Sequence, residues 1–277
     1  MELKGKVALV TGGGRSIGRG ISLALVDAGA KVMFNYVSDA EAAQHTHDLI
    51  KEKGGEAAFI EADVGEIEPC RELVRKANET FGQVDIFVSN AGIGQPQSIV
   101  DTPDDVWDRV MNVNVRATFA LARELLPGMV ERKHGRIVTI SSQGAAFAGK
   151  KLGGSKVTYG TSKAALLGLT KGIALEGAPY VTANAICPGG TAKEIASERG
   201  YDGNPPGEWP PPTAQDDPYL QTQSEDRREK KFLGRPVPLN RRGVPEDIAA
   251  GVLYLVADSG CFVTGQTIHI SGGCVMP

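Results

Sequence analysis

The sequence has no apolar stretch of the length that a membrane helix requires. Such a helix needs about 20 consecutive, mainly apolar residues, and every apolar run in this 277-residue chain is shorter. The N-terminus, MELKGKVALV, also lacks the pattern of a secretory signal peptide. We therefore expect a cytoplasmic protein that does not bind membranes.

Cysteine and histidine are scarce, with four of each. The cysteines show no CxxC spacing and are Cys70, Cys187, Cys261 and Cys274. Scattered cysteines without a secretion signal are typical of reduced thiols. His45 and His47 stand two positions apart, so on a helix they point in different directions. We predict no metal site.

The chain also has little net charge. It carries 30 basic and 33 acidic residues, a net charge of −3, which would not attract nucleic acid or an anionic membrane. The 41% of hydrophobic residues is enough for a sizeable core. Length alone allows one large α/β domain or two small ones.

Short, β-branched apolar runs alternate with longer amphipathic segments along most of the chain. The predicted strands are Val7–Val10, Val32–Tyr36, Ala57–Glu61, Ile86–Ser89, Ile137–Ser141, Thr182–Cys187 and Thr267–Ile270. This alternation predicts a doubly wound (Rossmann) α/β fold, a seven-stranded parallel sheet with helices on both faces. Since no linker interrupts it before residue 190, a single domain over residues 1–277 is favoured.

Helix ends are marked by capping residues. Ser38 and Glu41 form a capping-box pattern, and Gly54 follows the same helix. Thr102 is placed to cap the helix that starts at the next residue, and Pro245 opens the last helix.

The segment from Lys193 to about residue 235 departs from the alternation. It contains GNPPGEWPPPTAQDDP and the charged run SEDRREKK. Its aromatic residues, Tyr201, Trp209, Tyr219 and Phe232, favour a substrate lid over a disordered linker.

A glycine-rich stretch follows the first strand. Gly12, Gly13 and Gly14 stand at the strand end, and Gly18 and Gly20 fall in the next helix, although GxGxxG fails in every register. A strand, a glycine-rich turn and a helix N-terminus together form an anion site, from free N–H groups and the helix dipole. Phosphate binding and a plain turn both remain open on this pattern alone.

Five motifs together resemble the short-chain dehydrogenases/reductases. Thr11 to Gly18 is similar to their TGxxxGxG loop, with serine at the middle glycine, and Asp63-Val64 to their adenine-contacting pair. Ser89 to Gly92 resembles their NNAG turn, and Pro188-Gly189 the motif after their sixth strand. The fifth motif resembles their catalytic tetrad and comprises Asn114, Ser142, Tyr159 and Lys163. The resemblance covers nearly the whole chain and implies a homotetramer that binds a nicotinamide cofactor.

The resemblance and the residues around its motifs give the candidate cofactor-binding set. It comprises Gly12, Gly14, Arg15, Ser16, Ile17, Gly18, Tyr36, Ser38, Asp63, Val64, Asn90, Ala91, Gly92, Tyr159, Lys163, Pro188, Gly189 and Thr191. Thr191 is assigned to the nicotinamide contact because Lys193 stands where the family usually has threonine.

Ser16 replaces a glycine that allows unusual φ and close backbone approach. Serine is small and its hydroxyl can bind a phosphate oxygen, so we expect the substitution to be tolerated. In the alternative interpretation, residue 16 keeps a negative φ and its side chain turns to solvent.

Arg15 and Tyr36 bear on which dinucleotide binds. An acid at the end of the second strand would favour NAD, and Tyr36 stands there instead. Arginine in the preceding loop suits the 2′-phosphate of NADP. Asp39 argues weakly the other way or belongs to the next helix. We predict NADP(H) as the preferred cofactor, with NAD(H) possible.

The tetrad suggests carbonyl/alcohol chemistry. Tyr159 and Lys163 stand four apart in YGTSKAALLGLTKGIAL, so on a helix they share a face. We expect the charge of Lys163 to lower the pKa of Tyr159, which then acts as acid/base. Ser142 is expected to hold the substrate oxygen. Asn114 stands in a long apolar helical stretch, VMNVNVRATF, where a polar residue is often a satisfied core group. The resemblance makes it instead the anchor of a water that links Lys163 to solvent.

The substrate is less determined. An insertion before Tyr159, GKKLGGSK, places Lys150, Lys151 and Lys156 near the expected site. They form either a solvated basic turn or a site for an anionic substrate. The lid and the PGGT motif resemble ketone reductases of polyhydroxylated aromatics and NAD-dependent cis-dihydrodiol dehydrogenases. The C-terminal GQTIHISGG resembles 3-oxoacyl-carrier reductases. A non-catalytic dinucleotide-binding regulator is the alternative of another class.

Overall fold

The computed structural model describes residues 3–95, 97–145, 157–193, 195, 231–232, 235–239 and 241–276. Within them, one sheet of seven parallel strands has the order β3-β2-β1-β4-β5-β6-β9. Its strands are β1 (Val7–Val10), β2 (Lys31–Tyr36), β3 (Ala57–Glu61), β4 (Ile86–Ser89), β5 (Gly135–Ile140), β6 (Val181–Pro188) and β9 (Thr267–Ile270). The predicted α/β fold is confirmed, with strand limits shifted by one or two residues in β2, β5 and β6.

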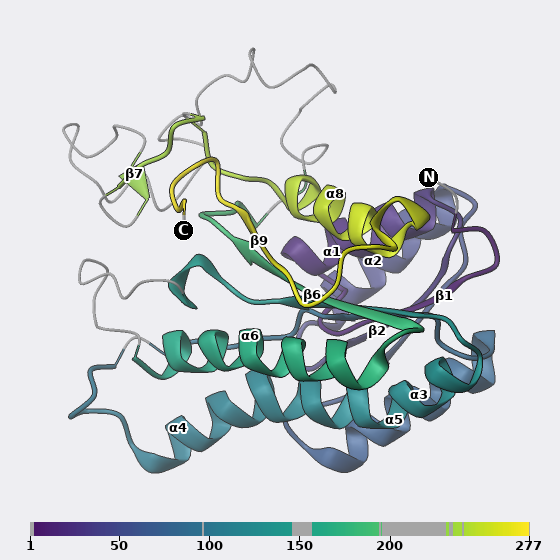
Figure 1. The fold of residues 1–277 in the computed structure, drawn as a ribbon, viewed down its shortest axis with the longest axis horizontal. Coiled ribbons are helices and arrows are strands. Elements are labelled where there is room, and N and C mark those ends of the chain that lie inside the picture. The colour runs from purple at the N-terminus through teal and green to yellow at the C-terminus, as the bar shows by residue number, and fades with distance from the viewer. Residues whose placement is uncertain are drawn as a thin grey trace.

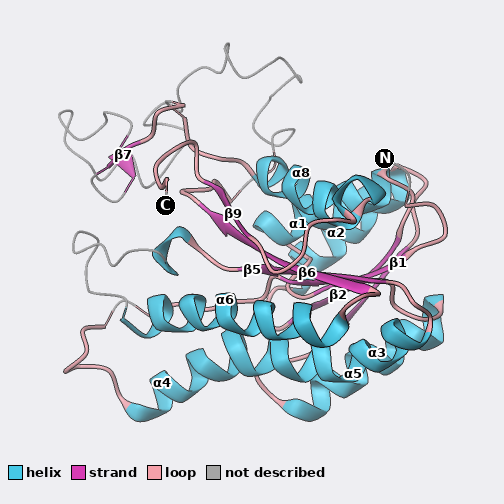
Figure 2. Cartoon of the chain, in the orientation of Figure 1, coloured by secondary structure: helices cyan, strands magenta, loops and turns pink. Residues whose placement is uncertain are grey.

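Helices cover both faces of the sheet (Figures 1 and 2). One face carries α1 (Ser16–Asp27), α2 (Ala40–Glu52) and α8 (Pro245–Val256). The other carries α3 (Ile67–Phe81), α4 (Asp104–Met111), α5 (Ala117–Glu131) and α6 (Val157–Gly177). Each face buries its own hydrophobic cluster, around Phe34 on the first face and Phe87 on the second. The strands are therefore apolar on both sides, as expected of a parallel sheet.

Strand β1 lies between β2 and β4, and Val10 is opposite Phe34 of β2 on one side and Val88 of β4 on the other. The strand order reverses at this point, between β1 and β4. The connections from β1 and β4 therefore leave in opposite directions and open a crevice at the carboxyl ends of these strands. Open α/β sheets bind their ligands at such a point.

Two helix starts differ from the prediction. The cap of α2 is Asp39, whose carboxylate accepts a 3.0 Å hydrogen bond from the N–H of Ala42, so the Ser38–Glu41 capping box is wrong. A carboxylate suits the positive helix end better than a hydroxyl. At α4 the cap position is Pro103, because the Thr102 hydroxyl donates instead to the Ser98 carbonyl at 2.6 Å.

A short π-helix, Asn112–Arg116, joins α4 to α5 and carries Asn114. Single π-helical turns occur frequently at functional sites. Helix α8 begins at Pro245 as predicted, and the Asp247 carboxylate accepts from the N–H of Val244 at 2.8 Å.

The predicted lid, residues 193–235, falls almost wholly outside the described residues. Of the part that is described, Ile195 is buried in the cluster shared by α1 and α8, and β7 (Lys231–Phe232) pairs antiparallel with β8 (Arg235–Pro236). In the described part of the chain, no helix has the length and apolar character needed to cross a membrane. The same residues contain no cluster of three or more potential metal-binding His, Cys, Asp or Glu.

Candidate active site

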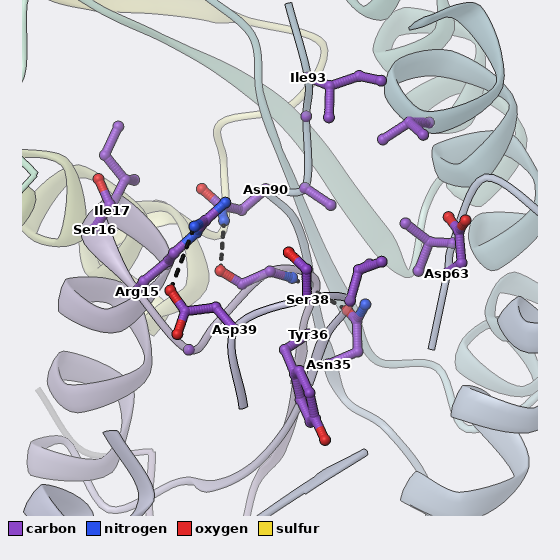
Figure 3. Close-up of a pocket in the computed structure, with 18 of the residues that line it drawn as sticks. Arg15, Ser16, Ile17, Asn35, Tyr36, Ser38, Asp39, Asp63, Asn90 and Ile93 are labelled. Carbon is purple, nitrogen blue, oxygen red and sulfur yellow. Dashed lines mark hydrogen bonds and ion pairs between the residues drawn. The ribbon is translucent and has the colours of Figure 1, made fainter. Parts of the chain in front are cut away.

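A cavity of about 370 Å³ lies where β1, β2, β3 and β4 end (Figure 3). Thirteen of the predicted cofactor residues line it: Gly12, Gly14, Arg15, Ser16, Ile17, Gly18, Tyr36, Ser38, Asp63, Val64, Asn90, Ala91 and Gly92. The sequence had not singled out six further lining residues as cofactor ligands: Asn35, Val37, Asp39, Ile93, Arg109 and Val113. The cavity therefore unites four motifs that are far apart in the sequence.

The glycine-rich turn and the start of α1 form one end of this cavity. Gly12 has φ +63°, and a Cβ on Gly18 would lie 2.0 Å from the carbonyl oxygen of Gly12, so no side chain fits there. Arg15 occupies the cap position of α1 without a side-chain hydrogen bond to the helix. The first-turn N–H groups and the helix dipole thus suit a pyrophosphate, and the residues present fit a dinucleotide.

Ser16 adopts φ +50°, in the left-handed region that favours glycine. The alternative in which this residue keeps a negative φ is wrong. A non-glycine residue costs roughly 1–2 kcal/mol in this region. The chain therefore keeps the turn conformation despite the substitution, at some cost in stability.

Polar side chains that are buried or half-buried hold the turn against the neighbouring strands. The Thr11 hydroxyl accepts from the N–H groups of Asn90 and Ala91 at 2.9 and 3.0 Å. The Asn90 amide donates back to the carbonyl oxygens of Thr11 and Gly12 at 2.9 and 3.2 Å. Asn35 accepts from the N–H of Gly12 at 3.1 Å. The one signal for Asn35 in the sequence is a polar residue inside an apolar strand.

Arg15 and Asp39 meet at the outer edge of the cavity, with Nη1 and Oδ2 3.4 Å apart (Figure 3). Both side chains are exposed. The ring of Tyr36 packs on Phe59, with centroids 5.9 Å apart. The edge beside β2 thus presents one cation and one anion.

Asp63 is paired at the opposite wall. Nη2 of Arg109 lies 3.0 Å from Oδ1 and 2.8 Å from Oδ2 of the carboxylate, which also accepts from the N–H of Gly65 at 2.9 Å. Arg109 comes from α4 and was missed, because an arginine on an amphipathic helix normally indicates a solvent face. Its pairing fixes the direction of the Asp63 carboxylate.

Helix α6 carries Tyr159 and Lys163 on the face that packs against β5 and β6. Lys163 is 3% exposed, its Nζ donates to the Ile140 carbonyl at 2.8 Å, and Nζ lies 5.9 Å from the centroid of the Tyr159 ring. Burial lowers the pKa of Lys163 to about 8. The predicted shared face of these two residues is confirmed.

The expected lowering of the Tyr159 pKa is wrong for the chain alone. Burial raises the pKa of the phenol, and the hydrogen bond from Ser142 offsets this only in part. Lys163 is bound to the Ile140 carbonyl and lies beside the ring, so desolvation of the phenolate outweighs its charge.

Asn114 is 1% exposed and fully paired. Its Oδ1 accepts from the N–H of Ile93 at 2.8 Å, and its Nδ2 donates to the Ile93 carbonyl at 2.9 Å and to the Ser162 hydroxyl at 2.9 Å. The π-helix thus links the loop after β4 to α6.

The loop after β4 brings the tetrad to the cavity. A Cβ on Gly92 would lie 3.0 Å from Nζ of Lys163, and one on Gly94 would lie 3.1 Å from a ring carbon of Tyr159. Gly92 and Ile93 line the cavity itself. Tyr159 and Lys163 therefore adjoin the cofactor cavity through this loop.

Three predicted cofactor residues lie apart from this cavity. Pro188 ends β6, Gly189 lines a separate cavity of about 90 Å³, and Thr191 pairs with Gly243 in an isolated bridge. The three lysines of the insertion, Lys150, Lys151 and Lys156, are outside the described residues.

The short chain dehydrogenase family model matches residues 6–202, which include every element of the cavity. This chain belongs to the short-chain dehydrogenase family. A second model, described as enoyl-(acyl carrier protein) reductase, matches residues 212–275.

Relatives match over nearly the whole chain. The chain is 36% identical to a versicolorin reductase of Emericella nidulans, covering 98% of this chain and 96% of that protein. It is 35% identical to a probable tetrahydroxynaphthalene reductase of Zymoseptoria tritici, covering 99% and 96%. Among solved structures, a blue fluorescent protein from a metagenomic library in complex with NADPH has a TM-score of 0.81 at 32% identity, with 100% of both chains covered.

This short-chain dehydrogenase is therefore an NAD(P)-dependent oxidoreductase that acts on CH–OH groups. The alternative function, a non-catalytic dinucleotide-binding regulator, is therefore set aside. The relatives belong to the polyhydroxyaromatic ketone reductase branch that the sequence resembles.

Proposed function

We propose that the enzyme reduces a ring-shaped or bulky ketone with NADPH. The observation that carries the cofactor preference is Arg15, which stands at the cavity edge beside the end of β2, where Tyr36 leaves no acid on the strand. A guanidinium in this place can bind the 2′-phosphate in forked geometry. The names of the relatives, versicolorin and tetrahydroxynaphthalene reductase, support an aromatic ring ketone.

The bound cofactor would supply the hydride to the carbonyl carbon. Tyr159 donates its phenolic proton to the carbonyl oxygen, and the Ser142 hydroxyl, which now bonds to Tyr159, turns to the same oxygen. Lys163 places a positive charge beside the phenol, which opposes the effect of burial as negative charge develops. Asn114 fixes the loop after β4 against α6, and we assign it the proton relay to solvent.

We further propose one domain over residues 1–277, with a lid at about 193–235, and a homotetramer. The support for assembly is exposed apolar side chains on α5 and α6: Phe119 is 48% and Leu175 is 80% exposed. Exposed apolar side chains that form a contiguous patch frequently mark interfaces.

The second candidate is an NAD-dependent cis-dihydrodiol dehydrogenase. The ion pair between Arg15 and Asp39 favours it, because the Asp39 carboxylate pairs with the guanidinium that would bind a 2′-phosphate. NADPH binding then requires the exposed pair to separate, which costs little in water.

Fluorescence titration with NADPH and NADH distinguishes the two. We expect NADPH to bind at least ~tenfold more tightly, a difference of ~1.4 kcal/mol. Arg15→Gln should remove this preference and leave NADH binding within about threefold. The control is Arg75→Gln, which removes an exposed arginine of α3 that pairs with Glu72 and Glu79 outside the cavity. If the parent binds NADH more tightly than NADPH, the NAD-dependent dihydrodiol dehydrogenase becomes the favoured function.

A further inference from the structure

Gln143 differs from the other buried amide side chains in the described part of the chain. Asn35, Asn114 and Asn184 are each 1% exposed, and each has hydrogen bonds at both ends of its amide. Gln143 is also 1% exposed, yet neither its Nε2 nor its Oε1 has a partner. Native proteins rarely keep such groups, and those that remain call for a specific explanation.

Gln143 is the chain neighbour of Ser142, one of the groups of the proposed reaction centre. Gln143 directly follows Ser142 and opens the short 3₁₀ turn Gln143–Ala145 after β5. The Ser142 hydroxyl accepts from the N–H of Gly144 at 3.1 Å, and a Cβ on Gly144 would lie 3.9 Å from a ring carbon of Tyr159. The turn that carries Gln143 therefore adjoins the groups assigned to the substrate carbonyl.

We propose that Gln143 is a substrate-recognition residue that binds a second oxygen of the ring ketone, a hydroxyl or carbonyl beside the reacting one. This inference rests on the proposed function. Nε2 donates to either kind of oxygen, and Oε1 accepts from a hydroxyl. Because no hydrogen bond holds the amide in the chain alone, its side chain rotates toward the substrate without breaking one.

This arrangement selects oxygenated rings. A site built to bind a hydroxyl rejects an analogue that lacks it, because the buried polar group then stays unpaired. Gln143 thus makes the chain alone less stable and gains its partner only with the correct substrate.

The first arm of the test needs no substrate. Gln143→Leu keeps a similar volume and removes an unpaired amide, so the Tm should stay within about 2 °C of the parent or rise. Asn184→Leu is the matched control: it removes an equally buried amide that bonds to the Val263 carbonyl and the Gln266 N–H, and should lower the Tm by about 4 °C or more. A drop in Gln143→Leu equal to that of Asn184→Leu would overturn the proposal.

The second arm compares tetralone with hydroxytetralone as substrates in the presence of NADPH. Gln143→Leu should raise KM for hydroxytetralone about tenfold and leave KM for tetralone within about twofold. Equal changes for both ketones would overturn the role of Gln143. If the parent reduces neither ketone, the proposed substrate class fails, and the Tm comparison still decides whether Gln143 is structural.

Discussion

Lys163 donates a 2.8 Å hydrogen bond to the carbonyl oxygen of Ile140 at the end of β5, inside the protein and beside the ring of Tyr159. Its ammonium is thereby fixed to the sheet as well as to α6. The fold holds a positive charge next to the proposed proton donor at the expense of desolvating that charge. This cost makes the stability of the protein depend on pH.

We expect Lys163 to contribute a rise in stability above about pH 8. Burial lowers its folded-state pKa from 10.5 to about 8, so between these values the unfolded chain binds more protons than the folded chain. The free energy of unfolding therefore increases with pH in this window. Relative to Lys163→Met, the parent should gain about 2 kcal/mol between pH 8 and pH 10 in urea unfolding.

Lys171→Met, on an exposed position of the same helix, is the control and should leave the pH dependence of the parent unchanged. If the free energies of unfolding of the parent and of Lys163→Met change in parallel with pH, the lowered pKa of the buried Lys163 is contradicted.

Arg109 should affect the adenine half of the cofactor only. Its guanidinium fixes the Asp63 carboxylate, and in Arg109→Ala this carboxylate is free to turn to solvent. We expect the Kd of adenosine diphosphate ribose to rise about three- to tenfold, while that of nicotinamide mononucleotide is unchanged. Since the pair is partly exposed, the free energy of unfolding should change by less than about 1 kcal/mol. Equal losses for both fragments would show that Arg109 acts on the whole fold.

Gly18 should not tolerate even one methyl group. A Cβ would overlap the Gly12 carbonyl at 2.0 Å, so Gly18→Ala should displace the turn and weaken NADPH binding at least about tenfold. Gly168→Ala on α6 is the matched change in open space and should be neutral or stabilise by up to about 1 kcal/mol. Titration measures NADPH binding and thermal unfolding measures stability. NADPH binding by Gly18→Ala equal to that of the parent would contradict the close contact between Gly18 and the Gly12 carbonyl.

Local patterns were enough to predict the sheet and most of the cavity. Alternation located the strands, because a parallel strand is apolar on both faces, and the motif order located Gly12, Asp63 and Asn90. Arg109 and Asn35 could not be found in this way. Each acts through a partner distant in sequence, Arg109 on Asp63 and Asn35 on Gly12.

Charge effects were predicted less well than positions. The shared face of Tyr159 and Lys163 follows from helical spacing, but the direction of the Tyr159 pKa depends on burial, which spacing does not give. The orphan amide of Gln143 likewise becomes visible only when every buried donor and acceptor has been placed. A glutamine after two serines carries no signal in the sequence.

The most direct test of the account is NADPH oxidation with hydroxytetralone by the parent, Tyr159→Phe and Tyr180→Phe. Removing a general acid typically costs about 10²–10⁴-fold in rate. We predict a loss of this size in kcat for Tyr159→Phe and parental activity for Tyr180→Phe, which alters a tyrosine near Lys133 outside the cavity. Turnover by Tyr159→Phe close to that of the parent would contradict the assignment of Tyr159 as the proton donor.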